Sequence, residues 1–216
     1  LLEVAAERGS LDAKVELGEE FLSGRVLERN EALATQFFAE ACQAGHLRGC
    51  ANLAEQFLAV EGAQAGELVQ RALDRVEAAC DADRFGRPCY LIGMAYEHGR
   101  GRPWGPSRAI DCYTRAVAHG NVDGAKALAR MAARDPGLAF DLAPAVPLLE
   151  QACNAGDAES CRALAWLHRS GRLGAEEPEL ARTLLERACA LGLPDACAAL
   201  EAQDPWAAWL RELRAR

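Results

Sequence analysis

The chain has 216 residues, of which 50% are hydrophobic and 26% are charged, and its net charge is −8. These proportions exclude a disordered chain and a fibrous protein, and the acidic balance argues against nucleic acid as a partner. No apolar run approaches the roughly 18 residues that a membrane-spanning helix needs, and the first residues lack the features of a signal peptide. Aromatic residues make up only 6%, which favours helices over a sheet sandwich.

Self-similar segments follow one another along the whole chain, at steps of 36, 38, 37, 36 and 36 residues. A fixed period of this size indicates a tandem repeat architecture. The alignment is anchored on Gly9, Gly45, Asp83, Gly120, Gly156 and Gly192. We predict a single repeat domain with repeats at 1–8 (partial), 9–44, 45–82, 83–119, 120–155, 156–191 and 192–216, the last being a C-terminal cap.

Both ends of the chain depart from a complete repeat. Residues 1–9 align with residues 184–192, so the chain opens inside a helix and we expect further residues upstream. At the other end, Asp204-Pro205 interrupts a new repeat, and a helix over 206–214 follows. Terminal repeats cover an open apolar face, and we expect Trp206, Trp209 and Leu210 to do so.

Each repeat is predicted to form two helices. After each anchor an apolar residue precedes a small one, as in Leu17-Gly18, and an aromatic or other side chain follows three residues later, as at Phe21. In the second helix, the pattern Ala34, Phe37, Phe38, Ala41 recurs with spacings of three and four, which place these residues on one stripe. Helix pairs with this period stack into a superhelical solenoid.

These residues resemble the Sel1-like repeats, which are relatives of the tetratricopeptide repeats, and specifically their cysteine-rich bacterial branch. The segment from Gly9 to Gly45 is similar to the family pattern nearly throughout, and the segment from Tyr96 to Gly101 matches equally well. The departures are a degenerate loop after Leu58 and a weak fourth repeat. The predicted fold is therefore an all-α, α/α superhelical solenoid of about five Sel1-like helix-pair repeats.

Eight of the nine cysteines occur in pairs that span the boundary between one repeat and the next. Where the first position of a pair is lost, so is the second, as at Val117 and Ala125. A cysteine at the end of one helix and another at the start of the next can approach within the Cα separation of a disulfide, about 4.4–6.8 Å. We predict four disulfides: Cys42 with Cys50, Cys80 with Cys89, Cys153 with Cys161, and Cys189 with Cys197.

Two alternatives for the cysteines stay open, namely buried thiols at helix junctions and zinc ligation. Zinc is disfavoured because no Cys-x-x-Cys pair occurs. Cys112 is left over and is predicted to be a buried thiol. Because disulfides persist in oxidising compartments, we expect the protein to be periplasmic or secreted.

The sequence shows no catalytic constellation. None of the five serines lies in a Ser-x-x-Lys or Gly-x-Ser-x-Gly motif, and the four histidines occupy different repeats or different repeat positions. We therefore predict no catalytic residue, no metal site and no cofactor. Some cysteine-rich relatives have been linked to β-lactams, so the resemblance implies an alternative: a periplasmic protein that binds or hydrolyses cell-wall fragments or β-lactams.

The inner face of the first helices is the predicted binding surface. If the repeats stack as tetratricopeptide repeats do, positions three, six, ten and thirteen after each anchor face solvent there, and these positions lie one residue later in the repeat that begins at Asp83. The residues selected at these positions are Tyr90, Lys126, Arg130, Arg162, Trp166 and Arg169. Basic groups beside aromatic anchors favour a non-enzymatic protein-protein interaction scaffold that binds an acidic or carboxylate-bearing protein or peptide on its concave face. A solvated charged face with an aromatic residue packed between repeats is the competing interpretation.

Overall fold

The computed structural model describes residues 2–62, 64–82, 86–135 and 137–201, and its regular elements in these ranges are helical. The helices are α1 (Leu2–Glu7), α2 (Leu11–Ser23), α3 (Glu31–Gln43), α4 (Leu47–Ala59), α5 (Glu67–Asp81), α6 (Gly86–His98), α7 (Pro106–Ala118), α8 (Val122–Arg134), the 3₁₀ helix η1 (Ala143–Ala145), α9 (Val146–Asn154), α10 (Ala158–Arg169), α11 (Pro178–Ala190) and α12 (Pro194–Glu201). The predicted all-α class is confirmed. None of the described helices is both long and apolar enough to cross a bilayer. The predicted C-terminal cap at Trp206, Trp209 and Leu210 lies outside the described residues.

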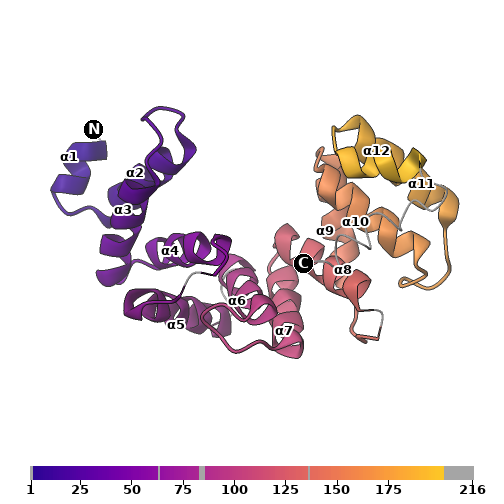
Figure 1. Cartoon of the computed structure of the whole chain (residues 1–216), viewed down its shortest axis with the longest axis horizontal. Coiled ribbons are helices and arrows are strands. Elements are labelled where there is room, and N and C mark those ends of the chain that lie inside the picture. Colours follow the sequence, from indigo (N-terminus) through magenta and orange to yellow (C-terminus); the bar gives the residue numbers. More distant parts are fainter. Residues whose placement is uncertain (1, 63, 83–85, 136, 202–216) are drawn as a thin grey trace. The chain divides into compact units, whose positions relative to one another are not determined.

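The chain divides into two compact units, Leu1–Cys112 and Tyr113–Arg216, and the boundary falls inside α7. In the N-terminal unit each helix from α1 to α6 packs against the next, while α4 also packs against α6 and α3 against α5 (Figure 1). In the C-terminal unit α10 packs against α8, α9 and α11, and α12 packs against α11. Equivalent helices of neighbouring repeats therefore lie side by side in each unit, as stacked helix pairs require.

A glycine with a left-handed backbone follows the second helix at five of the six repeat boundaries, and the sixth anchor, Asp83, lies outside the described residues. Gly45 has a φ of +95°, and the anchors at 9, 120, 156 and 192 also have positive φ. The N–H of Gly45 donates to the carbonyl of Cys42, and the N–H of His46 donates to the carbonyl of Ala41, both at 2.9 Å. Other residues adopt this backbone only at a cost of about 1 kcal/mol or more, which explains why glycine marks the period.

The residue after the anchor glycine begins the next helix. The Asn121 side-chain oxygen accepts a hydrogen bond from the N–H of Gly124 at 2.8 Å. The same capping position is occupied by Ser10, His46, Asn121 and Asp157. Two consecutive residues thus terminate one helix and start another, because the glycine satisfies the carbonyls of the first and the cap satisfies the amides of the second.

The two helices at such a junction approach backbone to backbone. A Cβ atom added to Gly49 would lie 2.7 Å from the Cβ of Ala41, and one added to Gly124 would lie 2.8 Å from the Cβ of Ala116. Real Cβ atoms do not come this close, so α3 and α4, like α7 and α8, meet where only small residues fit.

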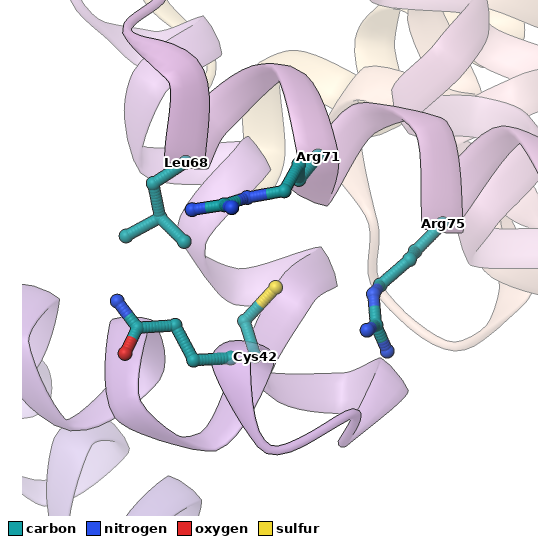
Figure 2. Close-up of a pocket in the computed structure, with 5 residues that line it drawn as sticks. Cys42, Leu68, Arg71 and Arg75 are labelled. Atoms are coloured by element: carbon teal, nitrogen blue, oxygen red, sulfur yellow. The ribbon is translucent and has the colours of Figure 1, made fainter.

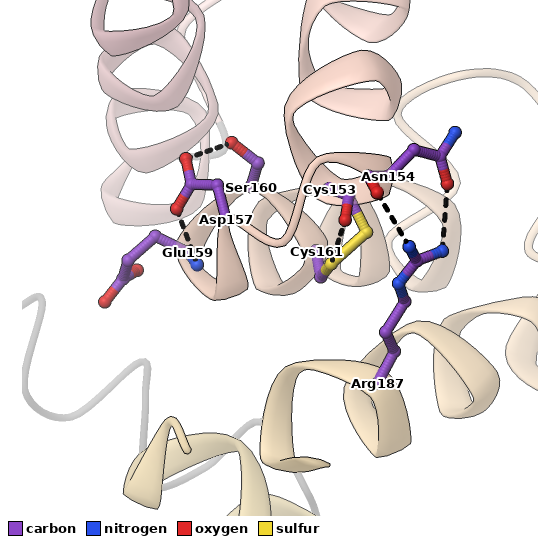
Figure 3. The surroundings of a disulfide bond; sticks show 7 residues. All are labelled: Cys153, Asn154, Asp157, Glu159, Ser160, Cys161 and Arg187. Carbon is purple, nitrogen blue, oxygen red and sulfur yellow. Dashed lines mark hydrogen bonds between the residues drawn. A yellow bond between two sulfur atoms is a disulfide. The ribbon is translucent and has the colours of Figure 1, made fainter. Parts of the chain in front are cut away.

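The short junction brings the paired cysteines within bonding distance. Cys42 and Cys50 have a Cα separation of 4.5 Å, and the pairs Cys80–Cys89, Cys153–Cys161 and Cys189–Cys197 have 4.7 Å. Figure 3 shows the third of these bonds at the turn between α9 and α10. The predicted pairing is confirmed in the structure. Cys112, which takes no part in these four bonds, is buried as expected.

The fourth repeat has a shorter second helix than its neighbours. Residues 143–145 form η1, and α9 then runs for only nine residues. Pro144 and Pro147 lie at the starts of these two elements, where a missing backbone N–H is tolerated. The weak match of this repeat to the sequence pattern therefore corresponds to a real change in its second helix.

Peptide mapping without reductant should recover the four links described above and a single thiol, titrated after denaturation. The Cα separations place each pair inside the range that a disulfide spans without backbone movement. Five or more titratable thiols in protein freshly purified from its native source would contradict both the pairing and an oxidising location.

A fifth disulfide should form when Val117 and Ala125 are both replaced by cysteine. These residues occupy the cysteine positions of the α7–α8 junction, and both are buried. Closing a ring of about nine residues should raise the free energy of unfolding by about 2.5 kcal/mol. Denaturant unfolding with and without reductant measures this gain.

The single variant Val117→Cys is the control, since it cannot form the bond at this junction. It should show no such reductant-dependent gain. If the oxidised double variant instead carries two more titratable thiols than the parent protein, the α7–α8 junction does not have the geometry of the other four.

Candidate functional site

In the N-terminal unit, one hydrogen-bonded network crosses the first helices α2, α4 and α6. Glu19 accepts from Nε of Arg48 and from Nδ2 of Asn52, each at 2.9 Å. The side-chain oxygen of Asn52 accepts from Arg87 at 2.7 Å, and Arg87 also pairs with Glu55. Asn52 is only 5% exposed, so its amide joins two ion pairs with both of its ends satisfied.

The inner positions counted from the repeat anchors include the four charged residues of this network, but they do not include Asn52. A polar amide between Ala51 and Leu53, in a helix whose other core positions are apolar or small, was the available signal. Buried amides need hydrogen-bond partners, which points to a linking role for such a residue.

In the C-terminal unit, Lys126 joins α8 to the start of α10. Its Nζ atom lies 2.9 Å from a carboxylate oxygen of Asp123 and 3.1 Å from one of Asp157. Asp157 also accepts from the hydroxyl of buried Ser160 at 2.7 Å and from the N–H of Glu159 at 3.2 Å, as Figure 3 shows. One carboxylate therefore caps α10 and pairs with the neighbouring first helix.

The surroundings of Lys126 and Asp157 favour the charged form of both. Burial acts to lower the pKa of Lys126, but its hydrogen bonds and charge interactions with Asp123 and Asp157 outweigh burial and raise that pKa. Burial acts to raise the pKa of Asp157, but Ser160 and Lys126 outweigh it and lower that pKa. The two groups therefore form an ion pair across the neutral pH range.

Arg162 and Arg169 on α10 form a row of cations together with Lys126 on α8. Arg162 lies 2.5 Å from Glu159 on its own helix and 3.2 Å from Asp195 on α12. Arg169 makes a looser pair with Glu176 at 3.9 Å, and its side chain is 44% exposed. Within the row formed by these two residues and Lys126, Arg169 is thus the cation held least tightly by its own chain.

The other predicted surface residues are less accessible. Trp166 is only 6% exposed, so its ring belongs to the packing of α10, as the competing interpretation expects for an aromatic residue here. Arg130 on α8 is half-buried. Tyr90 is half-buried on α6, in the N-terminal unit, whereas the other five predicted residues lie in the C-terminal unit.

The expectation that all four inner positions face solvent is wrong. Ala51, Leu58 and Ala133, at positions six and thirteen, are at most 4% exposed. Neighbouring first helices pack directly on one another within each unit, as α4 does on α6 and α8 on α10, and cover these positions. The groups that remain accessible are mainly charged, and the cations Lys126 and Arg162 are accompanied by carboxylates.

Several hydroxyl and imidazole groups of the described residues have structural partners. Ser10 caps α2, Ser23 and Ser170 donate to carbonyls of their own helices, and Ser160 donates to Asp157. His46 lies 2.9 Å from Asp12. Within the described ranges, no three His, Cys, Asp or Glu side chains gather closely enough to hold a metal ion.

Stacked helix pairs, a glycine turn at each described junction and ion pairs between successive first helices define an α-helical repeat protein. Three segments match the family model of the Sel1 repeat, at residues 11–46, 89–121 and 158–193. They correspond to the first, third and fifth repeats, while the departures noted in the sequence lie in the second and fourth. The chain therefore contains three Sel1 repeats, and proteins built from such repeats generally act as protein-interaction scaffolds.

Solved structures share this fold. The chain is similar to c5321, a protective antigen present in uropathogenic Escherichia coli strains and displaying an SLR fold, with a TM-score of 0.67 and 19% identity over 99% of this chain and 47% of that one. A Sel1 repeat protein from Oxalobacter formigenes has a TM-score of 0.63 and 19% identity, with 87% and 75% coverage. The immunity protein Pa5087 from Pseudomonas aeruginosa has a TM-score of 0.52 and 16% identity, with 95% and 78% coverage.

At these identities the likeness establishes the solenoid fold, which confirms the predicted architecture. The chain spans about half the length of the c5321 chain. No curated protein matches the sequence significantly.

Asp157→Asn should lower the free energy of unfolding and flatten its dependence on acid pH. Because the pKa of Asp157 is lowered by folding, its carboxylate contributes stability above the ordinary Asp pKa of about 3.9, and this contribution is lost as the pH falls through the lower folded value. Asparagine keeps the helix cap but not the charge, so we expect a loss of about 1 kcal/mol at neutral pH. Urea unfolding across the acid range measures both effects.

Asp111→Asn, at an exposed position of α7, provides the same change of charge as a control. It should leave stability and its acid dependence close to those of the parent. Equal acid slopes in the two variants would show that Asp157 contributes no ion-pair stability.

Proposed function

We propose that the protein is a non-enzymatic interaction scaffold whose first-helix face in the C-terminal unit binds an acidic or carboxylate-bearing segment of a partner protein. The observation that carries this proposal is the row of Lys126, Arg162 and Arg169 on α8 and α10. Their charged groups are held in place by carboxylates of the same chain.

Side chains already held in place lose less freedom when a partner arrives. A free arginine or lysine loses rotamer entropy on binding, whereas Arg162 is already fixed between Glu159 and Asp195. Arg169 is the most accessible member of the row, and its separation of 3.9 Å from Glu176 exceeds a hydrogen bond. A partner carboxylate can accept paired, charge-assisted hydrogen bonds from this guanidinium, because arginine presents its donors in a planar fork.

The carboxylates around the row set the expected strength of binding. A partner must replace contacts with Glu159, Glu176 or Asp195 rather than meet bare cations. Exposed ion pairs contribute only about 0–1 kcal/mol each. Replacing an ion pair within the chain by one with the partner therefore changes the binding free energy only slightly. We therefore expect modest affinity that weakens as salt rises.

The four disulfides support a periplasmic or extracellular location for this scaffold. Such bonds persist where thiols are not kept reduced. In these compartments a short repeat array gains stability from each cross-link, since a closed ring of this length restricts the unfolded chain.

We expect the chain to select acidic peptides, and we expect a single substitution in the basic row to weaken their binding. Random peptides displayed on phage, panned against the chain at low salt, should be enriched in Asp, Glu or free carboxyl ends. Arg169→Ala should weaken binding of the selected peptides by about fivefold or more, the loss of one charged hydrogen bond. Fluorescence anisotropy with the synthetic peptides measures the change.

Arg182→Ala is the matched control, because Arg182 is a 71% exposed arginine on α11 that pairs with Glu186. It removes the same charge from the second helix of the same repeat and should leave peptide affinity unchanged. Selected peptides without acidic groups, or equal affinity for the parent and Arg169→Ala at low and high salt, would rule out the basic row as the binding site.

A further inference from the structure

A hollow of about 430 Å³ lies between the second helices α3 and α5 of the N-terminal unit (Figure 2). Its lining consists of Cys42 and Gln43 from α3 and of Leu68, Arg71 and Arg75 from α5. We propose that this hollow is a binding site for a single carboxylate that carries an apolar group, supplied by a small organic acid or by the end of a peptide chain. It uses none of the residues of the face proposed above.

The two arginines give the hollow a net positive charge. Arg71 and Arg75 are one helical turn apart on α5, and like charges at this spacing repel each other. Arg71 pairs with Glu67 at 3.3 Å, but both side chains are more than half exposed, so this pair is weak. In the described part of the chain, no carboxylate pairs with Arg75. An anion between the two guanidinium groups would relieve their repulsion and accept their hydrogen bonds.

The remaining lining residues suit an apolar group beside the carboxylate. Leu68 is half-buried, and the sulfur of Cys42, whose residue is 1% exposed, lies across from it at the end of α3. Gln43 adds an amide that can donate a hydrogen bond to an anionic oxygen. The bond between Cys42 and Cys50 fixes this end of α3, so the lining from that side is held in place.

The end of α3 favours a carboxylate over a phosphate. The helix ends at Gln43, and its C-terminus carries a partial negative charge. The turn that follows is close to Arg75, because a Cβ atom on Gly45 would lie 3.2 Å from Nη1 of that arginine. The partial negative charge of the helix end offsets part of the positive charge of the two arginines. The remaining positive charge suits a singly charged carboxylate better than a doubly charged phosphate.

Nuclear magnetic resonance of the arginine Nε–H groups tests the site directly. N-acetyl-leucine, which joins one carboxylate to an apolar side chain, should produce saturable shifts of the Arg71 and Arg75 signals, with a dissociation constant in about the millimolar range expected for so small a ligand. N-acetyl-leucinamide, which lacks the charge, should produce none. An N-acetylated tetrapeptide ending in leucine identifies the source: tighter binding than N-acetyl-leucine indicates a chain end, and equal binding indicates a small acid.

The double variant Arg71→Gln with Arg75→Gln should weaken N-acetyl-leucine binding at least about tenfold, measured by the shift of the Gln43 side-chain amide. Arg29→Gln with Arg182→Gln removes the same charge at exposed positions and should leave the affinity unchanged. The proposal is overturned if N-acetyl-leucine gives no saturable shift in the parent, if inorganic phosphate binds more tightly than N-acetyl-leucine, or if both double variants lose affinity equally.

Discussion

The rest of the structure depends on one backbone constraint, the two-residue junction at which a left-handed glycine ends a helix and the next residue caps its successor. At Gly156 and Asp157 the chain reverses with no spare residues, so the two helices must touch at their ends. Contact at that distance admits only small side chains, as Gly49 and Ala41 show, and it brings the cysteine pairs at the glycine junctions within reach of a covalent bond. The period of the repeats, the close contact of the helices and the positions of the disulfides thus have a common cause.

Charged residues extend this arrangement from one repeat to the next. Arg87 and Lys126 each pair with a carboxylate of a neighbouring first helix or its cap, so these partly exposed groups that hold successive helices together also lie on the accessible face. A ligand on this face would compete with contacts that support stacking. Binding on the face proposed for the C-terminal unit would therefore be energetically coupled to the spacing of its repeats, because the same side chains would take part in both.

Features set by residues close together in the chain could be predicted from the sequence, whereas features set by contacts between distant residues could not. The anchor glycines and the cysteine pairs depend on a junction that is local in the chain, so their spacing alone determined their geometry. The burial of Trp166 and Ala51 depends on how closely neighbouring first helices approach, which no helical period specifies. The hollow lined by Gln43 and Arg71 joins helices of two repeats, and its residues share no motif. Spacing identifies a face, but packing decides which of its members reach solvent.

The disulfides have a consequence for how the chain matures. Each bond joins neighbouring cysteines, separated by eight or nine residues, so in a chain that entered an oxidising compartment from its N-terminus each partner would follow almost at once. A thiol that reacts with the first neighbour to emerge forms the native bond, and rearrangement by thiol exchange is not needed. Cys112 interrupts this order, but the next cysteine does not follow until 41 residues later. Once α7 has packed, the buried Cys112 thiol is no longer accessible for disulfide formation with other cysteines. Disulfide formation that proceeds from the N-terminus can therefore cross-link the repeats one after another, in the order in which they appear.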